Sequence, residues 1–264
     1  MKKLEGKVAL VTACTRGIGK AIVEKLSEEG ASVYMAVRRP EAAQQIADEL
    51  NQKGGNIHVV TYDGYDLNTI APMVTQVYEK AGKLDIIVNN QGGNGKGVTE
   101  DLDVVNTPVE AFQSQLDFNL SASYAACKAA IPYMIKCGGG SIINIASMNG
   151  EFADLMRTGY GVSKAALDKL TQNIAMQYGR AGIRCNAVAP GFIRTEAALS
   201  LPQQFIDGYV RHLPIKRLGE VEDIANAVLF FASEDSSWIS GQVLEVAGGF
   251  GCGTPMFADM IENA

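Results

Sequence analysis

The stretch that decides the fold is residues 8–19, which read VALVTACTRGIG. An apolar run passes there into a turn with two glycines, and from Ile18 onward apolar side chains recur at the i, i+3, i+4 and i+8 spacing of one helix face. Gly17 and Gly19 allow a ligand to approach the backbone closely, and the free N–H groups of a helix N-terminus favour anions. This strand–turn–helix order predicts a site for the pyrophosphate of a dinucleotide.

Apolar runs and amphipathic stretches alternate along the rest of the chain. Besides residues 8–11, strands are predicted over residues 33–37, 57–60, 84–88, 141–145, 183–188 and 243–246. Helices are predicted from Ile18 to Gly30 and over residues 41–53, 72–80, 158–179 and 221–232. Mostly apolar runs are typical of strands that a parallel sheet buries on both faces.

The sequence therefore predicts an α/β fold. We expect a single Rossmann-type domain over residues 1–264, with a doubly wound, parallel, seven-stranded sheet and helices on both faces. The cofactor-binding half is expected over about residues 1–150, and the catalytic and substrate part over about residues 140–264. No repeat or linker divides the chain.

Composition excludes several classes of protein. Hydrophobic residues make up 47% of the chain, which can form a folded core, and the net charge of −6 argues against a nucleic-acid binder. No apolar run approaches the roughly 18–20 residues that span a bilayer. The five cysteines form no C-x-x-C pair and the two histidines lie in no ligand pattern, so no disulfide framework and no metal site is expected. We expect a cytoplasmic protein that binds neither nucleic acid nor a membrane.

The end of the second predicted strand indicates which dinucleotide binds. In this kind of fold an Asp or Glu there binds the ribose 2′-OH of NAD, whereas an Arg accommodates the 2′-phosphate of NADP. The chain has Arg38 and Arg39 at this point and no carboxylate before Glu41. Arg16 adds a cation from the phosphate turn and Thr15 a hydroxyl, and guanidinium groups bind phosphate bidentately. The expected cofactor is NADP(H).

A second motif carries the chemistry. Tyr160 and Lys164 form a Tyr-x-x-x-Lys pattern that places both side chains on one helix face, and Ser147 follows the predicted strand 141–145. Reduction of a carbonyl needs a hydride and a proton donor at the oxygen. Tyrosine has a reference pKa of about 10, and a nearby ammonium favours the phenolate form. With Ser147 orienting the substrate oxygen, the three residues predict an oxidoreductase.

These motifs together resemble the short-chain dehydrogenase/reductase family over essentially the full chain. The family's T-G-x-x-x-G-x-G loop matches residues 12–19, its N-N-A-G motif matches residues 89–92, and its catalytic Asn matches Asn119. The resemblance implies a catalytic set of Asn119, Ser147, Tyr160 and Lys164. With the residues named above, it also implies cofactor contacts from Thr15, Arg16, Gly17, Ile18, Gly19, Arg38, Asp63, Asn90, Gly92, Tyr160, Lys164, Pro190, Gly191, Ile193 and Thr195. Similar proteins are homotetramers that pack the helices before and after the fifth strand, so we expect the same here.

Two residues depart from the family motifs. Ala13 replaces the first glycine of the loop, which removes some backbone freedom although a small residue should still fit. Gln91 replaces the small residue of N-N-A-G, close to where the adenosine ribose lies in similar proteins. Neither departure touches the catalytic set.

Within the family, the chain is similar to bacterial NADP-dependent 7α-hydroxysteroid dehydrogenases that act on bile acids. The shared stretches are residues 3–12, 130–132, 183–188, 222–229, 245–250 and 253–255. This resemblance implies a small steroid substrate. The candidates for an apolar substrate pocket are Met148, Phe152, Leu155, Met156, Phe192, Leu199, Leu201, Phe205, Tyr209 and Leu213. Arg157, Arg194 and Arg211 are candidates to meet a bile-acid carboxylate.

The sequence leaves other functions open. A hydroxysteroid dehydrogenase acting at the 12β or 3 position has the same catalytic set. A 3-oxoacyl carrier-protein reductase of the same family would need a basic patch for its acidic carrier, and no cluster of that kind stands out. A non-catalytic NADP-binding sensor would have no need for Ser147, Tyr160 and Lys164 together.

Overall fold

All seven predicted strands lie in one sheet. The computed structural model describes residues 2–93, 100–253 and 257–262, and its sheet has the order β3-β2-β1-β4-β5-β6-β7 with parallel pairing throughout. The strands are β1 Val8–Thr12, β2 Ser32–Val37, β3 Asn56–Thr61, β4 Ile86–Asn89, β5 Gly140–Ile145, β6 Ile183–Pro190 and β7 Val243–Val246. The prediction of a doubly wound, parallel, seven-stranded sheet is confirmed. The strand order reverses between β1 and β4, the point where ligands bind in this class of sheet.

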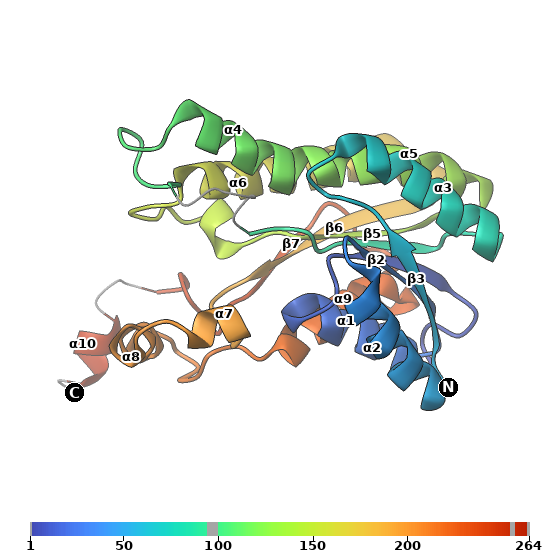
Figure 1. Cartoon of the computed structure of the whole chain (residues 1–264). Helices are drawn as coiled ribbons and strands as arrows, with labels where there is room; N and C mark the ends of the chain where they lie inside the picture. Colours follow the sequence, from blue (N-terminus) through green and yellow to red (C-terminus); the bar gives the residue numbers. More distant parts are fainter. Residues whose placement is uncertain (1, 94–99, 254–256, 263–264) are drawn as a thin grey trace.

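Helices cover both faces of the sheet (Figure 1). One layer contains α1 Gly17–Glu28, α2 Pro40–Gln52 and α9 Val221–Ala232, and the other contains α3 Ile70–Ala81, α4 Val109–Leu116, α5 Ala122–Lys136 and α6 Thr158–Tyr178. Helices α7 Glu196–Leu199, α8 Gln203–Arg211 and α10 Phe257–Glu262 lie together beyond one edge of these layers (Figure 1). Within the described residues, no helix is both long and apolar enough to cross a membrane.

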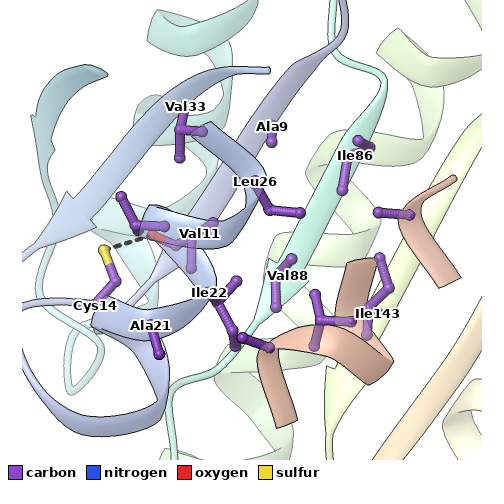
Figure 2. Packing of buried hydrophobic residues seen from close by; sticks show 14 of the residues in the cluster. Ala9, Val11, Cys14, Ala21, Ile22, Leu26, Val33, Ile86, Val88 and Ile143 are labelled. Carbon is purple, nitrogen blue, oxygen red and sulfur yellow. Dashed lines mark hydrogen bonds between the residues drawn. The ribbon is translucent and has the colours of Figure 1, made fainter. Parts of the chain in front are cut away.

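The side chains of β1 alternate between the two helical layers. Ala9 and Val11 pack with Ile22 and Leu26 of α1 in one core cluster (Figure 2). Leu10 points to the opposite face and packs in the cluster that α3 and α5 cover. Because both faces are buried, the strand has no polar side chain before its last residue, which explains the apolar run in the sequence.

The structure corrects several local predictions: helices α4, α7, α8 and α10 have no counterpart among the predicted helices, and β4 and α5 also differ. Strand β4 begins at Ile86 rather than residue 84, and directly before it the Asp85 carboxylate accepts a hydrogen bond from the Val8 N–H at 2.8 Å. Helix α5 has no counterpart among the predicted helices. It contains Pro132 and carries apolar residues on exposed as well as buried sides, including the exposed Ile135, so it shows no clear helical periodicity.

The turn after β1 contains a strained alanine. Ala13 has φ +53°, in the left-handed region that a Cβ disfavours, and it stands where the family motif has glycine. Its backbone N–H donates to the carbonyl of Ala36 on β2 at 2.9 Å, so the pairing of β1 with β2 continues into this conformation. The Ala13 side chain is exposed and loses no packing if it is removed.

We therefore expect Ala13→Gly to stabilise the protein by about 1 kcal/mol, since glycine adopts positive φ without the steric cost. Urea denaturation measures the change. Ala153→Gly is the matched control, because Ala153 is also exposed outside regular structure and is not in the left-handed region. That control should lose stability through chain entropy. A loss of stability in Ala13→Gly would contradict the strain at Ala13.

Candidate active site

The glycine turn between β1 and α1 has the geometry of an anion site. Gly17 has φ +53°, and no side chain caps the N-terminal N–H groups of α1. A Cβ on Gly19 would lie 2.5 Å from Asn90 Nδ2 and 2.8 Å from the Ala13 carbonyl oxygen, so only glycine fits there. Asn90 donates hydrogen bonds to the carbonyls of Thr12 and Ala13 at 3.1 and 3.0 Å, and this fixes the turn against the end of β4. The N–H groups of α1 are thus left for a ligand.

A cleft of about 660 Å³ extends from this turn to the Tyr-x-x-x-Lys motif. The predicted site residues that line it are Arg16, Gly17, Ile18, Gly19, Asn90, Gly92, Ser147, Tyr160, Lys164, Pro190, Gly191, Ile193 and Thr195. The fold therefore brings most of the predicted cofactor residues and three of the four predicted catalytic residues to one cavity. It lies where β1 and β4 end, at the reversal of strand order.

The other predicted cofactor residues surround the cleft without lining it. Thr15 lies half-buried in the glycine turn, and Arg38 is exposed directly after β2. Asp63 follows β3, where its carboxylate accepts from the Tyr65 N–H at 3.0 Å. The Arg38 guanidinium carbon lies 5.5 Å from the centre of the Tyr65 ring. Arg16 forms an exposed ion pair with Glu196 at 4.0 Å.

Asn119 lies in a π-helical turn, Asp117–Ser121, between α4 and α5. Such turns widen a helix locally and occur often at functional sites. The Asn119 amide donates to the Gln115 side chain at 2.9 Å and to the Gly93 carbonyl at 3.2 Å, and its oxygen accepts from the Gly93 N–H at 2.9 Å. Asn119 thereby holds the backbone after β4 beside the cleft.

Helix α6 places Tyr160 and Lys164 one turn apart. The Lys164 ammonium is buried, donates to the Ile145 carbonyl at 2.7 Å and lies 5.7 Å from the centre of the Tyr160 ring. Burial lowers the pKa of Lys164, and the positive charge of Arg157 lowers it further, whereas Tyr160 and Asp168 act in the opposite direction. An ammonium that is costly to keep buried favours a negatively charged neighbour.

Ser147 lies at the end of β5 on the same cleft. Its hydroxyl oxygen accepts a hydrogen bond from the Asn149 N–H at 3.2 Å and begins a short 3₁₀ turn, Met148–Gly150. This contact uses the oxygen as acceptor, so the hydroxyl hydrogen is left to donate to a ligand in the cleft.

Asp101 is a functional residue that the sequence did not reveal. Its carboxylate accepts from the N–H groups of Gly159 at 2.7 Å and Tyr160 at 2.9 Å, so it caps the N-terminus of α6 from a distant segment. The carboxylate fixes the backbone of Tyr160 directly. No local pattern could have identified it, because the contact spans 59 positions.

The three arginines suggested for a substrate carboxylate have other partners. Arg157 has a left-handed backbone, φ +65°, and its guanidinium carbon lies 3.9 Å from the centre of the Tyr160 ring. Arg194 pairs with Glu220 at 3.1 Å. Arg211 of α8 pairs with Asp259 and Glu262 of α10. The charges of Arg194 and Arg211 are therefore already compensated within the chain.

Aromatic rings form one connected wall, which reaches the cleft through Phe192. Phe152 meets Phe250 at 5.8 Å, Phe250 stacks on Tyr209 at 5.4 Å, and Phe192 contacts both Tyr209 and Phe205 at 5.0 and 6.0 Å between ring centres. Of the other apolar candidates, Met148 and Leu213 are buried core residues, whereas Leu155, Met156, Leu199 and Leu201 are exposed. The apolar residues thus divide into an aromatic wall, core, and exposed loops.

Comparison with known proteins agrees with this architecture. A family model described as enoyl-(acyl carrier protein) reductase matches residues 12–251. The chain belongs to the short-chain dehydrogenase/reductase family.

Its relatives include hydroxysteroid dehydrogenases. The chain is 46% identical over 260 residues to the 7α-hydroxysteroid dehydrogenase of Clostridium sardiniense, covering 98% of both proteins. It is 47% identical over 263 residues to that of Paraclostridium sordellii, covering 99% of this chain and 98% of the relative. A solved 7α-hydroxysteroid dehydrogenase in complex with NADH and 7-oxo-glycochenodeoxycholic acid is 36% identical, with a TM-score of 0.88 and coverage of 94% and 95%. These relatives support oxidoreduction of a steroid hydroxyl or ketone.

The site fits the nicotinamide cofactor that the family uses. The uncapped N-terminus of α1 offers N–H groups for the pyrophosphate, and Gly19 leaves no room for a side chain beneath it. A Cβ on Gly92 would lie 2.8 Å from Lys164 Nζ, so this glycine also keeps the cleft open beside α6. Among the described residues, no group of three or more His, Cys, Asp or Glu could hold a metal ion.

The departure at Gln91 has a structural explanation. The buried Gln91 amide donates to the carbonyls of Gly64 at 3.1 Å and Phe118 at 2.9 Å, and its oxygen accepts from the Tyr62 hydroxyl at 2.6 Å. A Cβ on Gly64 would lie 1.8 Å from the Gln91 side-chain oxygen. The large residue at position 91 therefore requires glycine at position 64.

We expect Gly64→Ala and Gln91→Ala each to destabilise the protein by about 2 kcal/mol, because each breaks buried hydrogen bonds. The double variant Gly64→Ala/Gln91→Ala should lose no more than Gln91→Ala alone. The three atoms nearest to the added Cβ all belong to Gln91, and the double variant removes them. Urea unfolding of all four proteins measures the coupling. Additive losses would contradict the contact.

Proposed function

We propose that this protein is an NADP(H)-dependent 7α-hydroxysteroid dehydrogenase that interconverts a bile-acid hydroxyl and ketone. The observation that carries the proposal is the single cleft lined by the glycine turn together with Ser147, Tyr160 and Lys164. The 7α-hydroxysteroid dehydrogenases among its relatives support the steroid substrate.

In the proposed reaction, Tyr160 moves the proton. Its hydroxyl gives a proton to the substrate oxygen during ketone reduction and takes one from the alcohol during oxidation. The Ser147 hydroxyl orients that oxygen by donating a hydrogen bond, and the Lys164 ammonium favours the phenolate form of Tyr160. Asn119 holds the backbone beside the cleft through Gly93. The bound nicotinamide supplies or accepts the hydride.

The preference for NADP rests on charge at the adenosine end of the site. Arg38 follows β2, where a phosphate-binding residue belongs in this fold, and Arg16 lies in the glycine turn. Among the described residues, no carboxylate forms an ion pair with Arg38. No carboxylate there therefore competes with a 2′-phosphate for its guanidinium. The solved relative is in complex with NADH, and this describes the cofactor of that protein and not of this chain.

The aromatic wall supports a steroid as substrate. Fused apolar rings bury their faces well against aromatic side chains, which offer large rigid surfaces at low entropy cost. Phe192 and Phe250 belong to segments that follow β6 and β7, and Phe152 follows Ser147. Phe192 also lines the cleft that contains Ser147, Tyr160 and Lys164, so the wall reaches the cleft through this ring.

We also propose a cytoplasmic homotetramer that packs α5 and α6 against their counterparts. Both helices present large apolar side chains to the surface, namely Tyr124, Ile135, Val162 and Met176. Such side chains at helical spacing suit a contact with another helix pair. Buried free thiols such as Cys127 and Cys185 suit a reducing compartment.

Replacing the proton-transfer group tests the mechanism. Tyr160→Phe should lower kcat by roughly two orders of magnitude, since a positioned acid–base group contributes about that much. Binding of NADP should persist, because the glycine turn is unchanged, and fluorescence titration measures it. Tyr178→Phe on the same helix, away from the cleft, is the control and should keep its activity. Near-normal turnover in Tyr160→Phe would exclude the proposed role.

Reversing the charge at Arg38 tests the cofactor. Arg38→Asp should lower kcat/KM for NADP by one to two orders of magnitude and improve it for NAD. A charge-assisted contact contributes roughly 1.5–3 kcal/mol, and Asp offers acceptors to the free 2′-OH of NAD. Arg39→Asp makes the same change in charge one residue later and should have a smaller effect. A wild-type protein that prefers NAD would overturn the assignment.

A further inference from the structure

Tyr65 contacts both Arg38, the expected phosphate-binding residue, and Phe118 of the π-helical turn, and neither the family motif nor the proposed mechanism uses it. Its ring stacks on Phe118 with a centre-to-centre distance of 4.4 Å and an interplanar angle of 14°. The Arg38 guanidinium lies 5.5 Å from the ring centre on the approach from β2. Tyr65 remains 41% exposed, so a large aromatic residue beside Arg38 is open to solvent.

The backbone under Tyr65 is held firmly. Gln91 donates to the Gly64 carbonyl directly before Tyr65 and to the carbonyl of Phe118, the ring on which Tyr65 stacks. The Tyr65 N–H donates to the Asp63 carboxylate at 3.0 Å. Two separate links, the side-chain stack and the Gln91 amide, therefore join the loop after β3 to the π-helical turn. Tyr65 thus has a fixed position from which its ring can restrict the rotamers of the exposed Arg38 side chain.

An exposed arginine loses much rotamer freedom when it binds a phosphate. An aromatic ring attracts a guanidinium electrostatically and occupies none of its N–H donors, which remain available for an anion. A ring that restricts the guanidinium before the ligand arrives therefore reduces the entropic cost of binding.

We infer that Tyr65 is a specificity-determining residue that pre-positions Arg38 for the 2′-phosphate of the cofactor. The inference rests on the proposed use of NADP. The proposed NADP preference then depends on the charge of Arg38 and also on the stack of Arg38, Tyr65 and Phe118 that holds this charge in place. The role belongs to the ring and not to the Tyr65 hydroxyl.

The test measures ligand binding without turnover. Adenosine 2′,5′-bisphosphate and adenosine 5′-monophosphate differ at the 2′-phosphate, and calorimetry on the full chain gives both dissociation constants. Tyr65→Leu should weaken binding of the bisphosphate about two- to fivefold and leave the monophosphate unchanged, in line with a contact between a cation and an exposed ring. Tyr65→Phe should bind both ligands like the wild type.

The chain offers a matched control on α5. Tyr133 stacks on Tyr78 at 4.3 Å and has the Lys136 ammonium 5.4 Å from its ring centre, so it repeats the arrangement of a cation and two rings. Tyr133→Leu removes a comparable stack and should leave the ratio of the two dissociation constants unchanged. If Tyr65→Leu does not fold, Tyr65→Gln replaces it.

Three results would overturn the inference. Equal weakening of both ligands in Tyr65→Leu would mean that the ring contacts the adenosine itself, and two unchanged dissociation constants would mean that Arg38 needs no platform. An equal loss in Tyr65→Phe would assign the effect to the hydroxyl. The wild-type protein alone tests the underlying proposal, since no preference for the bisphosphate would exclude NADP before any variant is compared.

Discussion

The site depends on the close approach of the turn after β1 to the end of β4. Thr12 accepts hydrogen bonds from the N–H groups of both Asn90 and Gln91, at 3.0 and 3.1 Å, and Asn90 returns two bonds to the turn. A Cβ on Gly19 would destroy this contact. Because the turn cannot move relative to β4, the N-terminus of α1 and the catalytic side of the cleft keep one fixed separation.

Polar contacts hold helix α6 on both sides of Tyr160 and Lys164. Asp101 binds the N–H groups of its first turn, and farther along Thr171 accepts from the Asn144 amide of β5 at 2.8 Å. Asn144 in turn accepts from Asn89 of β4 at the same distance. These polar contacts fix the helix that carries Tyr160 and Lys164 to the sheet in one orientation. Apolar packing alone would fix that orientation less strictly. The buried ammonium of Lys164 depends on this rigidity for its single described hydrogen bond.

The sequence predicts what local periodicity and short motifs determine. The seven strands, the glycine turn and the residues lining the cleft are where the sequence places them, since each depends on neighbours a few positions away. The cap from Asp101 and the partners of Arg211 could not be predicted, because only the folded chain brings them together. Gln91 was visible as a departure, but its dependence on Gly64 was not. The roles proposed for the catalytic and cofactor residues remain predictions.

The aromatic wall has a consequence for synthesis of the chain. Phe250 joins Phe152 to Tyr209, so the wall is continuous only through a residue that follows the last strand. A nascent chain can form the glycine turn and pair β1 with β2 and β4 long before Phe250 leaves the ribosome. The region that would hold a dinucleotide can thus fold early, whereas the surface that would contact a steroid is completed last.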